Sequence, residues 1–139
     1  KVALGSSVLD LAYRFGTDDW GIDSHTVEAK YRLRVGGSAY IEPQLRWYKQ
    51  NSADFYRLFL TSTPTGFMSA DPRLAAFTAT TVGVKLGMPL ANGDEVSVRL
   101  EAYQQDPKLR SSALTGLAGL DLNPRLRALV LQLNWRFGF

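Results

Sequence analysis

The sequence predicts an all-β fold made of long antiparallel strands. Apolar and polar residues alternate with a period of two in six segments, each long for a soluble strand. Short connections rich in turn residues alternate along the chain with long ones. No run approaches the ~18 consecutive apolar residues of a membrane-spanning helix. Together these features indicate a sheet in which each strand pairs with the next.

Three of the six segments lie at about 25–35, 39–49 and 94–105, and a fourth lies at about 6–16. In each, one face is apolar and the other is charged or polar, as in Lys30-Tyr31-Arg32. A fifth segment, at about 74–88, is rich in threonine and alternates less regularly. The turns at Gly36-Gly37-Ser38 and Asn92-Gly93 predict tight hairpins.

The sixth segment, at about 127–139, ends on an aromatic residue. It resembles the C-terminal strand of bacterial outer-membrane β-barrels, whose alternating apolar residues and terminal aromatic residue are recognised by the barrel-assembly machinery. This resemblance implies an assembly signal formed by Leu133, Trp135, Phe137 and Phe139. It also implies a location in the outer membrane of a Gram-negative bacterium, with outer-membrane lipid as a partner.

The connection lengths predict an orientation in that membrane. Such barrels have short periplasmic turns and long extracellular loops. If the C-terminus is periplasmic, both tight turns lie in the periplasm, and the long connections at about 17–24, 50–73 and 106–125 lie outside. The segment Asp54–Ser62 could form another strand, but we interpret it as part of the second long loop because this preserves the alternation.

Six strands are too few to close a membrane barrel, whose smallest form has ~8. An open sheet would leave backbone groups unpaired in lipid. We therefore expect residues 1–139 to be the C-terminal part of a single transmembrane β-barrel. The missing N-terminal strands, or strands of another chain, would complete it.

Three further segments carry a more specific resemblance. They are Trp20-Gly21-Ile22-Asp23-Ser24-His25-Thr26, then Arg46-Trp47-Tyr48 with Ala53-Asp54-Phe55-Tyr56, and finally Ser69-Ala70-Asp71-Pro72-Arg73-Leu74. Their order and spacing are similar to those of an uncharacterised family of Gram-negative outer-membrane proteins. The resemblance covers about residues 8–139 and implies a barrel longer than this chain. It implies no activity.

With the apolar face toward lipid, the polar face would line the lumen. Eight basic residues fall on it against five acidic ones, Asp10 and Glu95 included. We predict that the lumen is lined by Arg14, Glu28, Lys30, Arg32, Arg34, Glu42, Arg46, Lys85, Arg99, Glu101 and Arg136. Such a face could conduct ions, with a preference for anions, or could form ion pairs that stiffen the wall. The two roles are compatible.

Other kinds of site find little support. The chain has no cysteine, and its net charge of +3 comes from residues interleaved with apolar ones, which argues against nucleic-acid binding. His25 is the only histidine and no nucleophile elbow is present, so we predict no enzyme, cofactor or metal site. Asp18, Asp19 and Asp23, near His25, could form a calcium-type site or a pH switch, or could simply cap turns.

The sequence therefore favours an outer-membrane β-barrel that acts as a pore or transport conduit with a basic-biased lumen. Two alternatives remain. The barrel could be a non-conducting scaffold that holds a periplasmic, lipoprotein or redox partner. The chain could instead be a soluble lipocalin-like binding barrel.

Overall fold

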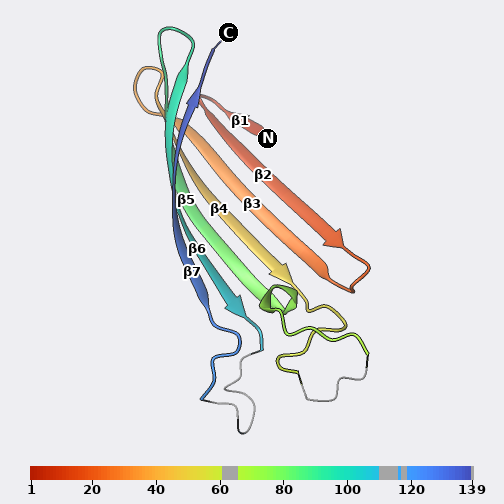
Figure 1. Cartoon of the computed structure of the whole chain (residues 1–139). Helices are drawn as coiled ribbons and strands as arrows, with labels where there is room; N and C mark the ends of the chain where they lie inside the picture. Colours follow the sequence, from red (N-terminus) through yellow and green to blue (C-terminus); the bar gives the residue numbers. More distant parts are fainter. Residues whose placement is uncertain (61–65, 110–115, 117–118, 139) are drawn as a thin grey trace.

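The protein forms one antiparallel sheet of seven strands (Figure 1). The computed structural model describes residues 1–60, 66–109, 116 and 119–138. A short 3₁₀ helix, η1 (Pro72–Leu74), precedes the fifth strand. The strands are β1 (Val2–Leu4), β2 (Ser7–Thr17), β3 (Asp23–Arg34), β4 (Tyr40–Gln50), β5 (Phe77–Pro89), β6 (Glu95–Pro107) and β7 (Leu126–Arg136). The prediction of an all-β antiparallel fold is confirmed.

Each strand pairs only with its neighbours in the sequence, and the sheet is not closed into a barrel. Strands β1 and β7 are therefore its two edges. The short turns lie at one end of the sheet together with the C-terminus, and the longer connections lie at the other (Figure 1). The part of the chain that is described contains no helix long and apolar enough to cross a membrane.

The sheet has one strand more than the six predicted. Strand β1 is only three residues long and folds back onto the start of β2, pairing Leu4 with Ser7. The turn between them needs Gly5, whose φ of 62° is unfavourable for residues with a side chain. Three residues are too short a segment for alternation to be recognised in the sequence.

Strand β5 begins at Phe77, later than the predicted residue 74. The Asp71 carboxylate accepts a hydrogen bond from the backbone N–H of Arg73 at 2.9 Å, and Pro72 starts a helical turn there. The Arg73 guanidinium also donates to this carboxylate and lowers the pKa of Asp71 to about 2. Residues 72–74 therefore form η1 instead of extending the strand.

Strand β7 ends at Arg136, short of the predicted residue 139, because β6 begins at its partner Glu95. Near the end of β7 the Asp94 carboxylate, which precedes β6, accepts hydrogen bonds from the C-terminal part of the chain. It accepts hydrogen bonds at 3.0 Å from the Gly138 backbone N–H and the Trp135 indole N–H. These bonds lower the pKa of Asp94, that from Gly138 most. The turn before β6 thus holds the end of the described chain.

The side chains of β2–β7 divide into two contrasting faces. Four consecutive rows of the apolar face carry only apolar residues, and on β7 they run from Leu129 to Trp135. These rows extend about 20 Å along the strands at a rise of ~3.4 Å per residue. The side chains are exposed, with Leu11 at 62% and Leu133 at 74%. No other element of the described chain packs on this face.

On the polar face, side chains from alternate strands meet above β5. The Tyr40 hydroxyl on β4 donates to Glu95 on β6 at 2.7 Å, and Gln44 on β4 donates to Glu101 on β6. Gly87 and Gly83 of β5 lie beneath these two contacts. Tyr40 is consequently only 6% exposed, although no second layer covers it.

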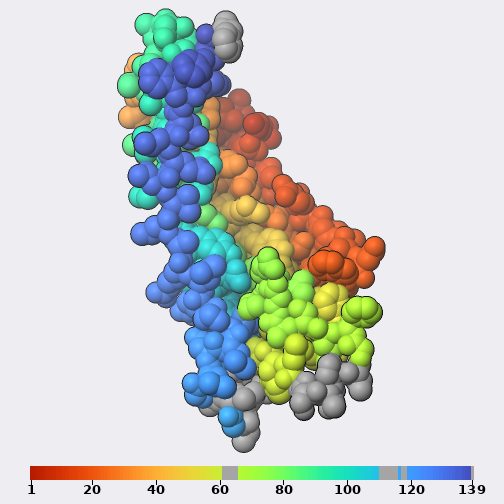
Figure 2. All heavy atoms as spheres, viewed as in Figure 1, coloured from red at the N-terminus to blue at the C-terminus, as the bar shows by residue number. Residues whose placement is uncertain are grey.

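The main cluster of buried apolar residues lies outside the sheet, at the end with the long connections. Ala53, Tyr56 and Ala75 form it, with Phe55 and Leu74 packed against them. These residues belong to the connection between β4 and β5, which Figure 2 shows as the green and yellow-green surface beside the first long loop. The Asp54 N–H donates to the Trp20 carbonyl at 2.9 Å, and burial raises the pKa of Tyr56.

The same region contains the segment that could have been another strand. Its described part, residues 54–60, belongs to none of the seven strands. Tyr56 forms only an isolated bridge with Ser69. Residues 61 and 62 of that segment lie outside the described residues.

Gly87→Ala should destabilise the fold, because a Cβ at Gly87 would overlap the Tyr40 ring. Such overpacking typically costs about 1–3 kcal/mol of the free energy of unfolding. Gly16→Ala on β2 is the matched control, because its Cβ would meet only the Ser24 hydroxyl, at 2.9 Å. Equilibrium urea unfolding measures both. Equal losses in the two variants would show that the Tyr40–Gly87 contact does not stabilise the sheet.

The contact between Asp94 and Gly138 should depend on pH. A carboxyl group with a lowered folded-state pKa stabilises the fold above its unfolded pKa, and this contribution is lost as the pH falls through the folded value. We expect the Gly138 amide to be protected from hydrogen exchange at about pH 6, relative to its intrinsic rate at that pH, and this protection factor to fall below about pH 4. Asp94→Asn should exchange faster near neutral pH. Identical pH profiles in the two proteins would contradict this assignment.

Candidate functional site

All eleven residues predicted to line a lumen lie on the polar face of the sheet. The strand register places them there without exception, because directly opposed residues share a face. Glu28 faces Arg46, for example, and Glu42 faces Lys85, which faces Arg99.

Most of the carboxylates on this face hold a basic partner. The ion pairs join Lys30 to Glu28 at 2.6 Å, Arg32 to Glu42 at 2.7 Å, Lys85 to Glu95 at 3.5 Å, Arg99 to Glu101 at 3.6 Å and Arg136 to Glu95 at 3.1 Å. Asp10 pairs with Lys1 at 3.2 Å. Three of these pairs join neighbouring strands, Arg32 with Glu42 and Lys85 and Arg136 with Glu95, whereas Lys30–Glu28 and Arg99–Glu101 lie within one strand. This network agrees with the structural role proposed for the charges.

Tyr40 forms the centre of this network at the end with the short turns. The Arg32 guanidinium lies over its ring, 4.1 Å from the centroid, and the Lys85 ammonium lies 5.4 Å from it. Its hydroxyl donates to Glu95, which Lys85 and Arg136 also contact. Cations above an aromatic ring are held by its quadrupole as well as by their carboxylates. Tyr40 thus orders a group of side chains from four strands.

Three arginines of the polar face stand apart from the network. Within the described chain, Arg14, Arg34 and Arg46 have no carboxylate within ion-pair distance. Arg34 lies near the short turns, in a hollow of about 370 Å³ with Arg32 and Tyr40. Arg14 and Arg46 line another hollow, of about 260 Å³, toward the long connections. These guanidiniums are the ones free to contact a solute.

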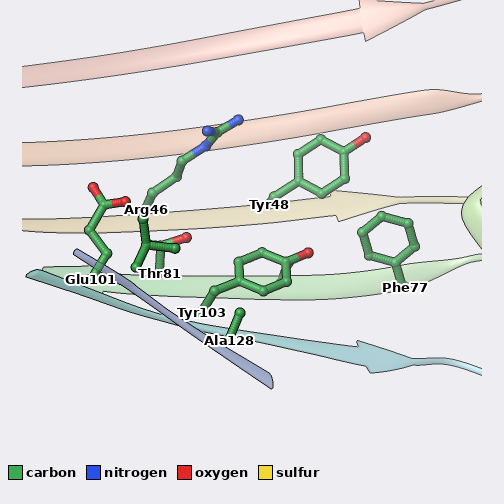
Figure 3. Close-up of a pocket in the computed structure, with 9 residues that line it drawn as sticks. Arg46, Tyr48, Phe77, Thr81, Glu101, Tyr103 and Ala128 are labelled. Atoms are coloured by element: carbon green, nitrogen blue, oxygen red, sulfur yellow. The ribbon is translucent and has the colours of Figure 1, made fainter. Parts of the chain in front are cut away.

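A second feature of the polar face is aromatic. Tyr48, Phe77 and Tyr103 project from β4, β5 and β6 beside a hollow of about 520 Å³ that Arg46 and Glu101 also line (Figure 3). The Tyr48 and Phe77 rings are 5.5 Å apart between centroids. The sequence analysis missed this group. The alternation does place Tyr48 between Arg46 and Gln50, and Tyr103 between Glu101 and Gln105, on the polar face.

Of the acidic residues near His25, Asp18 has a structural role in the first long loop. The Asp18 carboxylate accepts the backbone N–H groups of Trp20 at 2.9 Å and Ile22 at 3.0 Å, which is a turn-capping arrangement. His25 Nδ1 is hydrogen-bonded to the Tyr13 hydroxyl at 2.8 Å. Among the described residues, no three His, Cys, Asp or Glu side chains are grouped to hold a metal ion.

The residues predicted to form an assembly signal fall into two parts. Leu133 and Trp135 lie on the apolar face of β7, and Phe137 stacks on Trp135 with a centroid separation of 5.8 Å. Phe139 lies outside the described residues.

Comparison with known protein families matches residues 1–137 to the family described as "Protein of unknown function (DUF3570)". The chain belongs to this family. The match covers all seven strands and assigns neither an activity nor a location. Comparisons with curated proteins and with solved structures gave no significant match.

The ion-paired and unpaired arginines of β3 should differ in their effect on stability. Arg32→Met removes the partner of Glu42, which is only 8% exposed, and should cost about 1–3 kcal/mol of the free energy of unfolding. Arg34→Met, on the same face of the same strand, should change it by no more than about 0.5 kcal/mol. Urea unfolding compares the two variants. A larger loss for Arg34→Met would contradict the assignment of the network.

Proposed function

We propose that this chain forms part of the wall of an outer-membrane β-barrel in a Gram-negative bacterium. Its polar face would line a pore or transport conduit with a charged, basic-biased lumen. The proposal assigns the chain no catalytic role. One observation carries it: the apolar face is broad and continuous and most of its side chains are exposed, whereas on the charged face Tyr40, Glu42 and Ser97 of β4 and β6 are buried.

The dimensions of the apolar face support a lipid environment. Its four apolar rows are followed, toward the long connections, by a row that contains Tyr13 and Trp47. The four apolar rows extend about 20 Å along the strands, and the mixed row with Tyr13 and Trp47, which also contains Thr80, Gln104 and Arg127, lies where the aromatic residues that flank the ~25 Å apolar band of membrane barrels would lie. A soluble protein would cover such a face with a second layer of structure. A bilayer needs no such layer.

The polar face supports a conduit for anions. The acidic residues are largely held in ion pairs, while Arg14, Arg34 and Arg46 remain without a carboxylate partner in the described chain. The uncompensated charge on this face is therefore positive. Charged groups that line a channel select permeating ions by sign.

A barrel in a membrane requires further strands at the two open edges of this sheet, β1 and β7. Unpaired backbone groups of β1 and β7 would be very costly in lipid, so further strands must pair with them. These strands would come from an N-terminal part of the protein or from another chain. Insertion by the barrel-assembly machinery, guided by Leu133, Trp135, Phe137 and Phe139, belongs to the same proposal.

Two other functions were considered from the sequence. A non-conducting scaffold for a periplasmic, lipoprotein or redox partner is favoured by the ion-pair network, since paired charges also fill and stiffen a wall. A soluble lipocalin-like barrel would place its apolar face inside. Side chains of the charged face such as Tyr40 and Glu42 are buried, whereas most of the large apolar side chains are exposed. This favours an arrangement with the charged face inside and the apolar face outside.

Conductance and charge reversal test the conduit. The full-length protein, reconstituted in planar bilayers, should conduct with a preference for anions. Arg34→Glu with Arg46→Glu should shift the reversal potential in a salt gradient toward cation selectivity, because both positions face the lumen without a carboxylate partner. Lys49→Glu with Arg127→Glu makes the same change of charge on the opposite face and should leave the potential unchanged.

Three outcomes would count against the conduit. Equal shifts in both double variants would show that the polar face does not line the path. An absence of conductance, with a stoichiometric partner co-purifying, would favour the scaffold. Failure to require detergent or lipid for solubility would contradict the membrane location itself.

A further inference from the structure

We propose that the hollow beside Tyr48, Phe77 and Tyr103 is a binding site for a carboxylate carried on a six-membered ring. The inference rests on the proposed conduit and names the class of solute that its wall would recognise. The hollow lies on the polar face, toward the end of the sheet with the long connections (Figure 3). Two of its properties, an aromatic lining and an unpaired guanidinium, define the ligand.

The aromatic surface is unusual for its position. Tyr48, Phe77 and Tyr103 come from adjacent strands on a face that otherwise carries mainly charged and amide side chains. Small residues also line the hollow, namely Ala79 and Thr81 of β5 and Ala128 of β7. These leave the hollow open beside the rings. Aromatic side chains bury large areas against apolar or planar groups, so this surface favours a solute with a ring face.

The hydroxyl groups of Tyr48 and Tyr103 already donate hydrogen bonds to other side chains of the sheet. The Tyr48 hydroxyl donates to the Gln50 side-chain oxygen at 2.7 Å, and the Tyr103 hydroxyl donates to that of Gln105 at 2.8 Å. Each glutamine lies two residues further along the same strand. These bonds fix the positions of the tyrosine hydroxyls. A ligand therefore does not have to accept hydrogen bonds from them. The rings are therefore the part of these residues available for contact.

The charge of the hollow is positive. Arg46 has no carboxylate within ion-pair distance in the described chain, whereas Glu101 accepts from Gln44 and pairs with Arg99. Arg14 lies on the other side of Arg46, in the adjoining hollow. A guanidinium offers parallel N–H groups that match a carboxylate in a bidentate contact. An anionic group on the ligand would supply the negative charge that Arg46 lacks within the described chain.

The two properties together exclude simpler ligands. An inorganic anion or acetate would leave the rings without a contact, and a neutral ring would leave Arg46 unpaired. A cation would be repelled by Arg46 and Arg14. A volume of about 520 Å³ accommodates a single ring with its carboxylate. Both aromatic acids and uronic acids have this chemistry, and the experiment separates them.

Isothermal titration calorimetry with the full-length protein in detergent tests the proposal. Benzoate represents the aromatic acids and galacturonate the uronic acids. Acetate lacks the ring, and benzyl alcohol lacks the carboxylate. At least one of the two ring carboxylates should bind saturably, with an affinity at least tenfold higher than acetate and benzyl alcohol. The tighter of the two identifies the source.

Variants locate the binding to this hollow. Arg46→Gln should weaken the binding about tenfold, whereas Arg34→Gln, an equally unpaired arginine elsewhere on the face, should not change it. Tyr103→Phe keeps the ring and should retain binding, whereas Tyr103→Leu should weaken it. Circular dichroism verifies that each variant retains its β structure, so that a loss of binding is not a loss of fold.

The proposal is overturned if neither ring carboxylate binds saturably, if acetate binds as tightly, or if Arg34→Gln and Arg46→Gln weaken the binding equally. Calorimetry needs no ion flow, so the outcome is independent of conductance. Binding without conductance would overturn the conduit and retain this site. Conductance without binding would do the reverse.

Discussion

The arrangement of side chains on the polar face depends on two glycines of β5, Gly83 and Gly87, which have no Cβ atom. Gly83 and Gly87 leave space for side chains of β4 and β6 to meet above the strand that separates them. A Cβ at Gly87 would overlap the Tyr40 ring. Without that ring, Arg32 and Lys85 lose their cation–π contact, and Glu95 loses a hydrogen bond. Two small residues therefore permit a network that extends over several strands.

The network in turn determines which charges remain for function. It engages the carboxylates of the face and leaves three arginines outside it, one near the short turns and two toward the long connections. The residual charge of the wall is thus positive and localised, not spread over all the basic residues. The opposite face has no comparable network and no covering layer. This contrast between a self-covering charged face and an exposed apolar face supports a barrel wall in a membrane.

Much of the fold could be predicted from the sequence because a period of two is a direct consequence of strand geometry. The placement of the eleven residues predicted to line a lumen on one face follows from the same period. The ends of the strands could not be predicted as well, since local hydrogen bonds decide them. Asp71 and Pro72 convert the expected start of β5 into a helical turn, and Asp94 captures the chain after β7. Alternation carries no information about such contacts.

The sequence by itself determined the fold class and the division of side chains between two faces, because alternation assigns every residue of a strand to one side. It could not determine which charges pair, since this depends on the register between strands. Nor could it group Tyr48, Phe77 and Tyr103, which are distant along the chain and come together only across paired strands. The tertiary structure decided these matters, and with them which arginines lack a partner, because contacts across a sheet join residues that local sequence keeps apart.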